Sequence, residues 1–145
     1  MIIKEANNTR IFIGRLGFAK DVIEEFIRLS KENDIQAAWL QGIGALTMAS
    51  VTEYDPFAAA YKEPIVFNKT IEIISLKGNI SILDGEPFVH IHLHGSYFGD
   101  DNKIELVSGH LVKSEIFATE FKIEVFDDVE LTRSFDSETG LNLWK

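Results

Sequence analysis

Cysteine is absent from this chain, and proline occurs only three times in 145 residues. The lack of cysteine excludes a disulfide framework, a thiolate metal site and a cysteine nucleophile. The serine-nucleophile motif Gly-x-Ser-x-Gly is missing as well, which argues against a serine hydrolase of that kind. Any bound metal ion must therefore be held by histidine, carboxylate and water ligands.

Basic residues are also few, with 14 lysines and arginines against 23 aspartates and glutamates. The formal net charge of −9 opposes binding to a polyanion unless the basic residues gather on one face. They are scattered singly along the sequence. We therefore expect that this chain alone does not bind bare DNA.

Long apolar runs are missing too. No stretch approaches 18 consecutive apolar residues, and the first residues are not a basic segment followed by an apolar one. We therefore expect a cytoplasmic protein without membrane association. Since 46% of the residues are hydrophobic, the chain can form a substantial core. We expect one domain over residues 1–145, with its core at about 10–126 and a C-terminal tail at 127–145.

The periodicity of apolar residues predicts one amphipathic helix over residues 21–33, with Val22, Phe26 and Leu29 on one stripe. Residues 56–64 are expected to form a loop. The tail carries several large apolar side chains, so we expect it to pack at the periphery or against a neighbouring subunit. The other predicted elements are strands at residues 10–16, 36–43, 46–54, 66–76, 78–83, 89–98, 104–112 and 117–126.

Two histidines, His90 and His92, lie two residues apart in the apolar strand Phe88-Val-His-Ile-His-Leu93. Alternate side chains of a strand share one face, so the two Cα atoms lie roughly 6.5–7 Å apart and both imidazoles point the same way. This spacing allows both rings to reach one metal ion.

The position of His110 follows from the expected hairpin. Gly99-Asp100-Asp101-Asn102 is a turn signal between two strands. If the loop has three residues centred on Asp101, then His110 pairs with His92 on the same face. A loop one residue shorter or longer would place His110 on the opposite face, unless a bulge at Gly109 restored the phase.

Three imidazole nitrogens suit Zn²⁺ and leave a fourth position for water or a substrate atom. His94 continues the same face, but three successive histidines of one straight strand span about 13 Å, too far for one ion. We expect His94 to be an outer neighbour of the site. The alternative is a row of ordinary hydrogen-bonded histidines on a solvated face or in a crevice.

Two glycine motifs have simpler interpretations than ligand binding. Gly42-Ile-Gly44 resembles the start of a dinucleotide-binding motif, but Thr47 stands where the third glycine belongs and a strand follows. A turn or bulge is favoured there. Asp84-Gly85 is expected to form a turn before the histidine strand, although Asp84 could also accept a hydrogen bond from a histidine ligand.

Four carboxylates lie in or beside predicted strands and are candidates for a general base near a metal-bound water. Most charged residues on strands are simply solvated, so none is favoured by its position alone. They are Glu53, Asp55, Glu72 and Glu120.

An ordered set of motifs over about Arg10 to Val125 resembles the plants-and-prokaryotes-conserved (PPC) domain. The resemblance implies an α/β (α+β) single compact domain, in which an amphipathic helix packs on an antiparallel-rich mixed sheet, and assembly as a homotrimer. The motifs are Asp21-Val-Ile-Glu24, Gly42-Ile-Gly-Ala-Leu46, Tyr54-Asp55, Glu72-Ile-Ile-Ser-Leu-Lys-Gly-Asn-Ile80, Asp84-Gly-Glu-Pro-Phe-Val-His-Ile-His92, Ser108-Gly-His-Leu111 and, in the tail, Asp136-Ser-Glu-Thr-Gly-Leu141.

The resemblance also implies that His90, His92 and His110 form a metal site, and it favours Glu120 among the carboxylates. Ser108 stands where a second glycine is usual in the family, and His94 is extra. Plant members carry AT-hooks, Arg-Gly-Arg-Pro elements that enter the DNA minor groove, and this chain has none. Prokaryotic members are often described as DNA-binding by analogy with them.

Three functions follow as hypotheses. The first is a homotrimeric zinc-binding module, binding or regulatory in role, that offers a surface to a protein or small-molecule ligand. The second is an enzyme in which the metal activates water or polarises a carbonyl or phosphoryl group while Glu120 moves the proton. The third is DNA binding through the trimer or through a partner that supplies positive charge.

Overall fold

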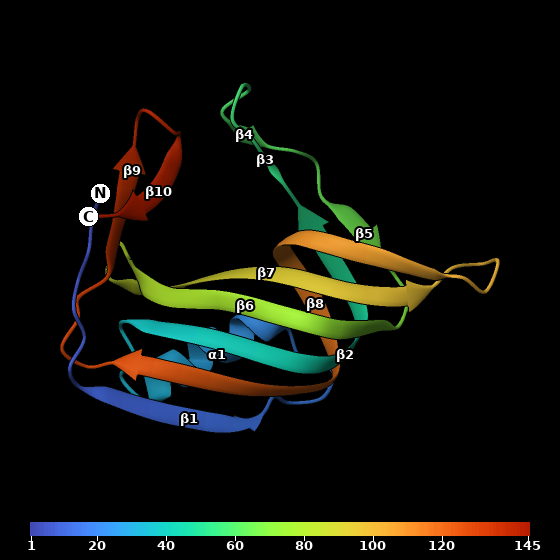
Figure 1. Cartoon of the computed structure of the whole chain (residues 1–145), viewed down its shortest axis with the longest axis horizontal. Helices are drawn as coiled ribbons and strands as arrows, with labels where there is room; N and C mark the ends of the chain where they lie inside the picture. The colour runs from blue at the N-terminus through green and yellow to red at the C-terminus, as the bar shows by residue number, and fades with distance from the viewer.

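The computed structural model describes residues 1–145 as one large sheet, a two-stranded ribbon and a single helix (Figure 1). The elements are β1 (Thr9–Arg15), α1 (Val22–Glu32), β2 (Ala38–Thr52), β3 (Tyr54–Asp55), β4 (Ala60–Tyr61), β5 (Ile65–Phe67), β6 (Ile71–Leu83), β7 (Glu86–Phe98), β8 (Ile104–Phe126), β9 (Thr132–Asp136) and β10 (Leu141–Trp144).

The large sheet closes on itself through its longest strands. β8 pairs with β7 over residues 104–110 and with β2 over residues 110–125. Since β6 pairs with both β2 and β7, the four strands form a closed ring. β1 and β5 extend the ring at β8 and β2, and the tail hairpin β9–β10 joins it through a short parallel pairing with β6. The predicted fold class, an antiparallel-rich mixed sheet with one packed helix, is confirmed.

The helix α1 lies against one face of the sheet, behind the strands in Figure 1. Its N-cap is Asp21, whose carboxylate accepts a hydrogen bond from the backbone N–H of Glu24 at 2.9 Å and from that of Ser114 at 2.7 Å. Val22 and Phe26 are fully buried and anchor the apolar stripe in the core. The prediction of residues 21–33 is correct to within one residue at each end. No helix of the structure is long and apolar enough to span a membrane.

Glycines that suggested strand ends lie within continuous strands. The two strands predicted at 36–43 and 46–54 are one strand, β2, with a bulge between Gly42 and Gly44. Gly78 was expected to separate two strands, but β6 runs through it. A Cβ atom at Gly78 would lie 2.1 Å from the carbonyl oxygen of His90, so glycine is required there for the close approach of β6 and β7.

Two other predicted boundaries differ from the structure. The strands expected at 104–112 and 117–126 are one strand, β8, because residues 113–116 also pair with or run alongside β2. The expected strand 66–76 is interrupted, since β5 ends at Phe67 and β6 begins at Ile71. The expected loop at 56–64 is present apart from the two-residue strand β4.

Residues of β7 alternate between the two faces of the sheet. Val89, Ile91 and Leu93 are buried in the core beneath the helix, whereas the even-numbered residues from His90 to His94 lie on the opposite face. We call that opposite face the outer face. The tail hairpin covers one end of it, where Arg133 donates hydrogen bonds to side chains of β6.

Candidate metal centre

The register of the hairpin β7–β8 places the third histidine. The backbone N–H of Gly99 donates to the carbonyl of Lys103 at 2.8 Å, which leaves a three-residue loop centred on Asp101. Asn102 in this loop has a φ of 59°, as in the common three-residue hairpin connection. His92 therefore pairs with His110, and the predicted register is confirmed.

The three rings converge on one point. The Nε2 atoms of His90 and His92 lie 3.2 Å apart, and one ring nitrogen from each of His90, His92 and His110 lies within 4.8 Å of the others. Two nitrogens bound to one tetrahedral zinc ion at about 2.0–2.1 Å are separated by about 3.3 Å. The observed spacing therefore fits a shared metal ion with little movement of the side chains.

The surroundings favour the neutral imidazoles that a metal requires. Burial, followed by the proximity of His110 and His92, lowers the pKa of His90 to about 4. Burial, followed by the proximity of His92, also lowers the pKa of His110. The Nδ1 atom of His110 is buried without a hydrogen-bond partner, and coordination of a metal ion through it would satisfy this atom.

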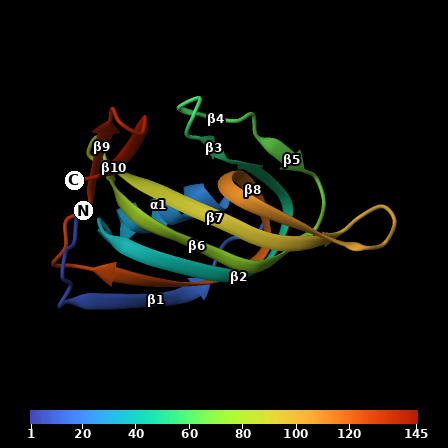
Figure 2. The same cartoon turned by 45° about the horizontal axis from the view of Figure 1, so that its top comes forward.

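A cavity of about 360 Å³ adjoins the histidines. Its walls come from β4, β7, β8 and the tail hairpin, and Figures 1 and 2 show that the ribbon β3–β4 and the hairpin β9–β10 rise on the same side of the sheet. The lining residues are Tyr61, Phe88, His90, His110, Arg133, Gly140, Leu141, Asn142 and Leu143.

Aromatic contacts connect the expected loop to the metal centre. Tyr61 packs on His110 with a ring separation of 5.1 Å, and Tyr54 packs on Tyr61 at the same distance. The hydroxyl of Tyr54 donates to the carbonyl of Thr139 in the tail, at 2.5 Å. The tail, the β3–β4 ribbon and the histidine hairpin thus form one connected wall.

Neither Tyr61 nor Arg133 was singled out from the sequence. Arg133 lines the cavity beside His90, and it is only 9% exposed. Burial lowers the pKa of its guanidinium, and the nearby phenol of Tyr61 opposes that shift. No motif marks either residue, because both reach the site through folding of distant segments.

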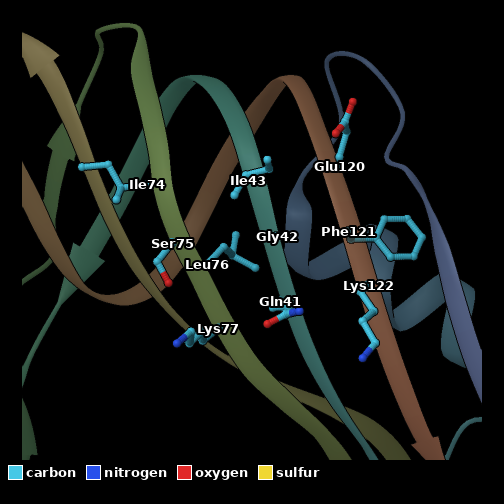
Figure 3. Close-up of a pocket in the computed structure, with 10 residues that line it drawn as sticks. All are labelled: Gln41, Gly42, Ile43, Ile74, Ser75, Leu76, Lys77, Glu120, Phe121 and Lys122. Carbon is cyan, nitrogen blue, oxygen red and sulfur yellow. The ribbon is translucent and has the colours of Figure 1, made fainter.

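Glu120 lies apart from the histidines within one chain. It lines a separate open hollow of about 500 Å³ on the outer face, with Lys77 and Lys122 nearby (Figure 3). The second half of β8 is separated from β7 by β2 and β6, which corresponds to about 14 Å along the sheet. The structure therefore does not bring Glu120 to the metal centre of its own chain.

The remaining candidates lie outside the cluster. His94 pairs with Ser75 and Ser108 and is not part of the three-histidine group. Glu53 forms an ion pair with Lys62, while Asp55 accepts backbone hydrogen bonds in a turn. Glu72 lines another hollow of the surface. Asp84 lies in the two-residue turn between β6 and β7, as predicted, with a φ of 51°.

Comparison with known proteins identifies a family and several solved structures that are similar to this chain. Residues 3–127 match the family described as the Plants and Prokaryotes Conserved (PCC) domain. The chain is similar to a metal-containing protein from Archaeoglobus fulgidus, at 34% identity and a TM-score of 0.90, over 100% of this chain and 99% of the other. No curated protein matches the sequence.

Two further structures share the fold. A plant- and prokaryote-conserved (PPC) protein from Pyrococcus horikoshii is 28% identical with a TM-score of 0.87, over 100% of this chain and 97% of the other. A proposed DNA-binding protein from Bacteroides thetaiotaomicron is 24% identical with a TM-score of 0.82, over 98% and 94% of the two chains. The last comparison supports the fold alone.

Proposed function

Since the chain belongs to the Plants and Prokaryotes Conserved (PCC, or PPC) domain family, we propose that it is a homotrimeric metal-binding module. In this proposal one Zn²⁺ ion per chain is held by His90, His92 and His110. The single observation that carries it is the convergence of three ring nitrogens within 4.8 Å. The similar protein from Archaeoglobus fulgidus is described as metal-containing, which supports a metal but not its identity.

Zinc is favoured among divalent metals by the ligands. Three neutral imidazoles suit Zn²⁺, which is intermediate between hard and soft metal ions and is commonly tetrahedral. The chain has no cysteine thiolate that would select a softer metal ion. Three protein ligands leave one position of a tetrahedral ion free. The adjoining cavity gives that position access to a small molecule, so the bound ion would supply Lewis acidity or a binding contact there.

Metal analysis of purified protein tests this assignment. Prepared without a histidine tag or chelators, the protein should retain close to one zinc ion per chain. His92→Ala should bind zinc more than about 100-fold more weakly. Loss of a residue that only orients a metal ligand lowers metal affinity up to about 100-fold, and loss of the ligand itself should lower it more. His94→Ala, which lies outside the cluster, is the matched control and should keep its metal. Full occupancy in the triple variant His90→Ala/His92→Ala/His110→Ala would disprove the site.

The homotrimer is supported by apolar side chains on the outer face. Ile13 on β1 is 80% exposed, Ile43 on β2 is 57% exposed and Ile74 on β6 is 50% exposed. The register shifts of β2 and β6 lie at Ile43 and Ile74, and both side chains line the hollow of Figure 3. Large exposed apolar groups on neighbouring strands are typical of a surface that is covered in an assembly.

A metal-dependent enzyme is the second candidate, favoured by the cavity that opens beside the three histidines. In this alternative the metal activates water or polarises a small substrate, and Glu120 moves the proton. Glu120 can do so only if a neighbouring chain of the trimer carries it to the histidines, since it lies three strands from β7 in its own chain. The module requires no such approach.

A further inference from the structure

Arg133 is a buried cation without an acidic partner. Only 9% of its surface is exposed, yet each hydrogen bond that its guanidinium donates goes to a neutral oxygen. Nε donates to Ser81 Oγ at 2.7 Å, Nη1 to the carbonyl of Asn142 at 2.8 Å and Nη2 to Asn79 Oδ1 at 2.8 Å. A buried charge normally has a counter-ion, and here the protein supplies none.

The guanidinium retains donors for a ligand. Arginine has five N–H groups, and three of them are used in these bonds, so one N–H on each terminal nitrogen is left. Phe88 and Trp144 pack on the guanidinium, with its central carbon 5.0 Å and 5.6 Å from the two ring centroids. These contacts hold the group in a fixed plane, which favours recognition of a planar anion.

The electrostatics of the cavity differ from those of the whole chain. None of the nine residues that line it is acidic, although the chain carries a net charge of −9. The cavity contains two of the three histidines and Arg133. A bound divalent ion would add two positive charges beside the arginine, so an anion is the complementary ligand.

We propose that this cavity binds a small organic carboxylate, whose carboxylate group is recognised by Arg133 and faces the metal position. A carboxylate is favoured because its planar oxygens match the two remaining N–H groups and because Phe88, Leu141 and Leu143 offer apolar walls to a short carbon chain. The volume of about 360 Å³ suits a small molecule. The attraction of the carboxylate to the metal rests on the proposed function. The contact of the carboxylate with Arg133 is independent of the metal.

The test uses the full chain loaded with Co²⁺, whose visible spectrum reports changes in coordination, and butyrate as the probe. Butyrate should produce a saturable spectral change, whereas the neutral analogue butyramide should bind at least about tenfold more weakly, because a hydrogen bond to a charged group is lost. Inorganic phosphate should also bind more weakly than butyrate. Equal binding of butyrate and butyramide, or stronger binding of phosphate, would overturn the proposal.

Arg133→Met retains an apolar side chain between the two aromatic rings and should weaken butyrate binding at least about tenfold while keeping one metal per chain. Arg28→Met, on the exposed side of α1, is the matched control and should bind butyrate as the unchanged protein does. If Arg133→Met does not fold, Arg133→Lys keeps the charge but loses the planar fork and should bind butyrate with intermediate affinity. Unchanged binding in a folded Arg133 variant contradicts the proposal.

The two proposals fail in different ways. If the protein binds no metal, the proposed function is wrong. Calorimetry then measures the binding of butyrate and butyramide to the metal-free chain, where Arg133 is the proposed contact for the carboxylate. Binding of butyrate in preference to butyramide would still support the carboxylate site. Absence of any preference there would overturn it.

Discussion

His110 differs from the other two histidines because its Nδ1 atom is buried and has no partner in the protein. That atom is available to a metal ion, whereas the 3.2 Å approach of His90 and His92 could also be a hydrogen bond between two neutral rings. The two observations together favour a metal ion over a row of solvated histidines.

The pKa shift of His90 predicts how stability depends on pH. Burial and the neighbouring histidines lower its pKa from 6.5 to about 4, so the unfolded chain binds more protons than the folded chain between these values. The chelator-treated protein should therefore lose stability as pH falls from about 6.5 towards 4. Thermal unfolding measured across this range checks the sign.

His90→Gln removes one of the two half-buried titrating histidines and should reduce this dependence between pH 4 and 6.5, while His110, whose pKa is also lowered by burial, maintains the remainder. His94→Gln, outside the cluster, is the control and should leave the slope unchanged. A protein that becomes more stable on acidification through this range would contradict the assignment. With zinc bound the slope should steepen, because protons compete with the metal for imidazole.

Local patterns predicted the histidine cluster, and long-range contacts supplied the rest of the cavity. The spacing of His90 and His92 and the three-residue loop are short-range features, so they determined the position of His110 from sequence. Tyr61 and Arg133 reach the same cavity from segments that lie far away along the chain. Nothing in their local sequence distinguishes them from any other tyrosine or arginine of the chain.

At the level of elements, the close packing of β6 on β7 positions the histidine strand. His90 pairs with Asn79 and His92 with Lys77, so Gly78 lies directly between the two histidine pairings. The sequence suggested a strand end at this glycine because glycine commonly marks turns. The structure has a different reason for it, which is the 2.1 Å approach that a Cβ atom would make to the His90 carbonyl.

Gly78→Ala should therefore destabilise the fold and disturb the metal centre. The added methyl group has to displace strand backbone and the side chain of Ile91, and such overpacking costs about 1–3 kcal/mol. Urea unfolding measures this loss, and metal analysis should show weaker zinc binding. Gly17→Ala is the control, since its Cβ would contact only the flexible side chains of Glu25 and Lys20. Equal stability of the two variants would disprove this account of Gly78.

The same reasoning explains the boundaries that were misplaced. β2 and β8 are long because each pairs with different partners along its two halves, and bulges let them bend from one partner to the next. At such a bend the alternation of apolar and polar residues changes phase, so the sequence pattern predicts the end of one strand and the start of another. The helix has no comparable ambiguity, because its stripe and its Asp21 cap lie within a single segment.

For the whole molecule, the trimer predicts a mass of about three times 16.4 kDa by light scattering in dilute solution. Paired substitution Ile13→Arg/Ile43→Arg on the outer face should reduce the mass towards that of one chain, because assembly through this face would bury two unpaired positive charges from each chain. Phe57→Arg is the control, since Phe57 is fully exposed in the loop before β4. A monomer that does not change with concentration in the unchanged protein would overturn the assembly.

The charge distribution of the whole molecule predicts that it does not bind bare duplex DNA at physiological salt. Affinity for DNA depends on clustered lysines and arginines that contact phosphates, and three chains of −9 carry −27. Half of the 14 basic residues are already engaged in ion pairs with carboxylates, and Arg133 is buried. The paired residues are Arg10, Arg28, Lys31, Lys62, Lys69, Lys103 and Lys122.

Fluorescence anisotropy with random and AT-rich duplexes at about 0.15 M salt tests this directly. We expect no binding at submicromolar protein to either duplex, and no gain from AT-rich sequence, because the chain has no AT-hook. Submicromolar binding that weakens steeply with salt would mean that several phosphates are contacted, and it would contradict this prediction. Binding that appears only with an added basic partner would instead agree with the charge argument, since that partner supplies the phosphate contacts that this surface lacks.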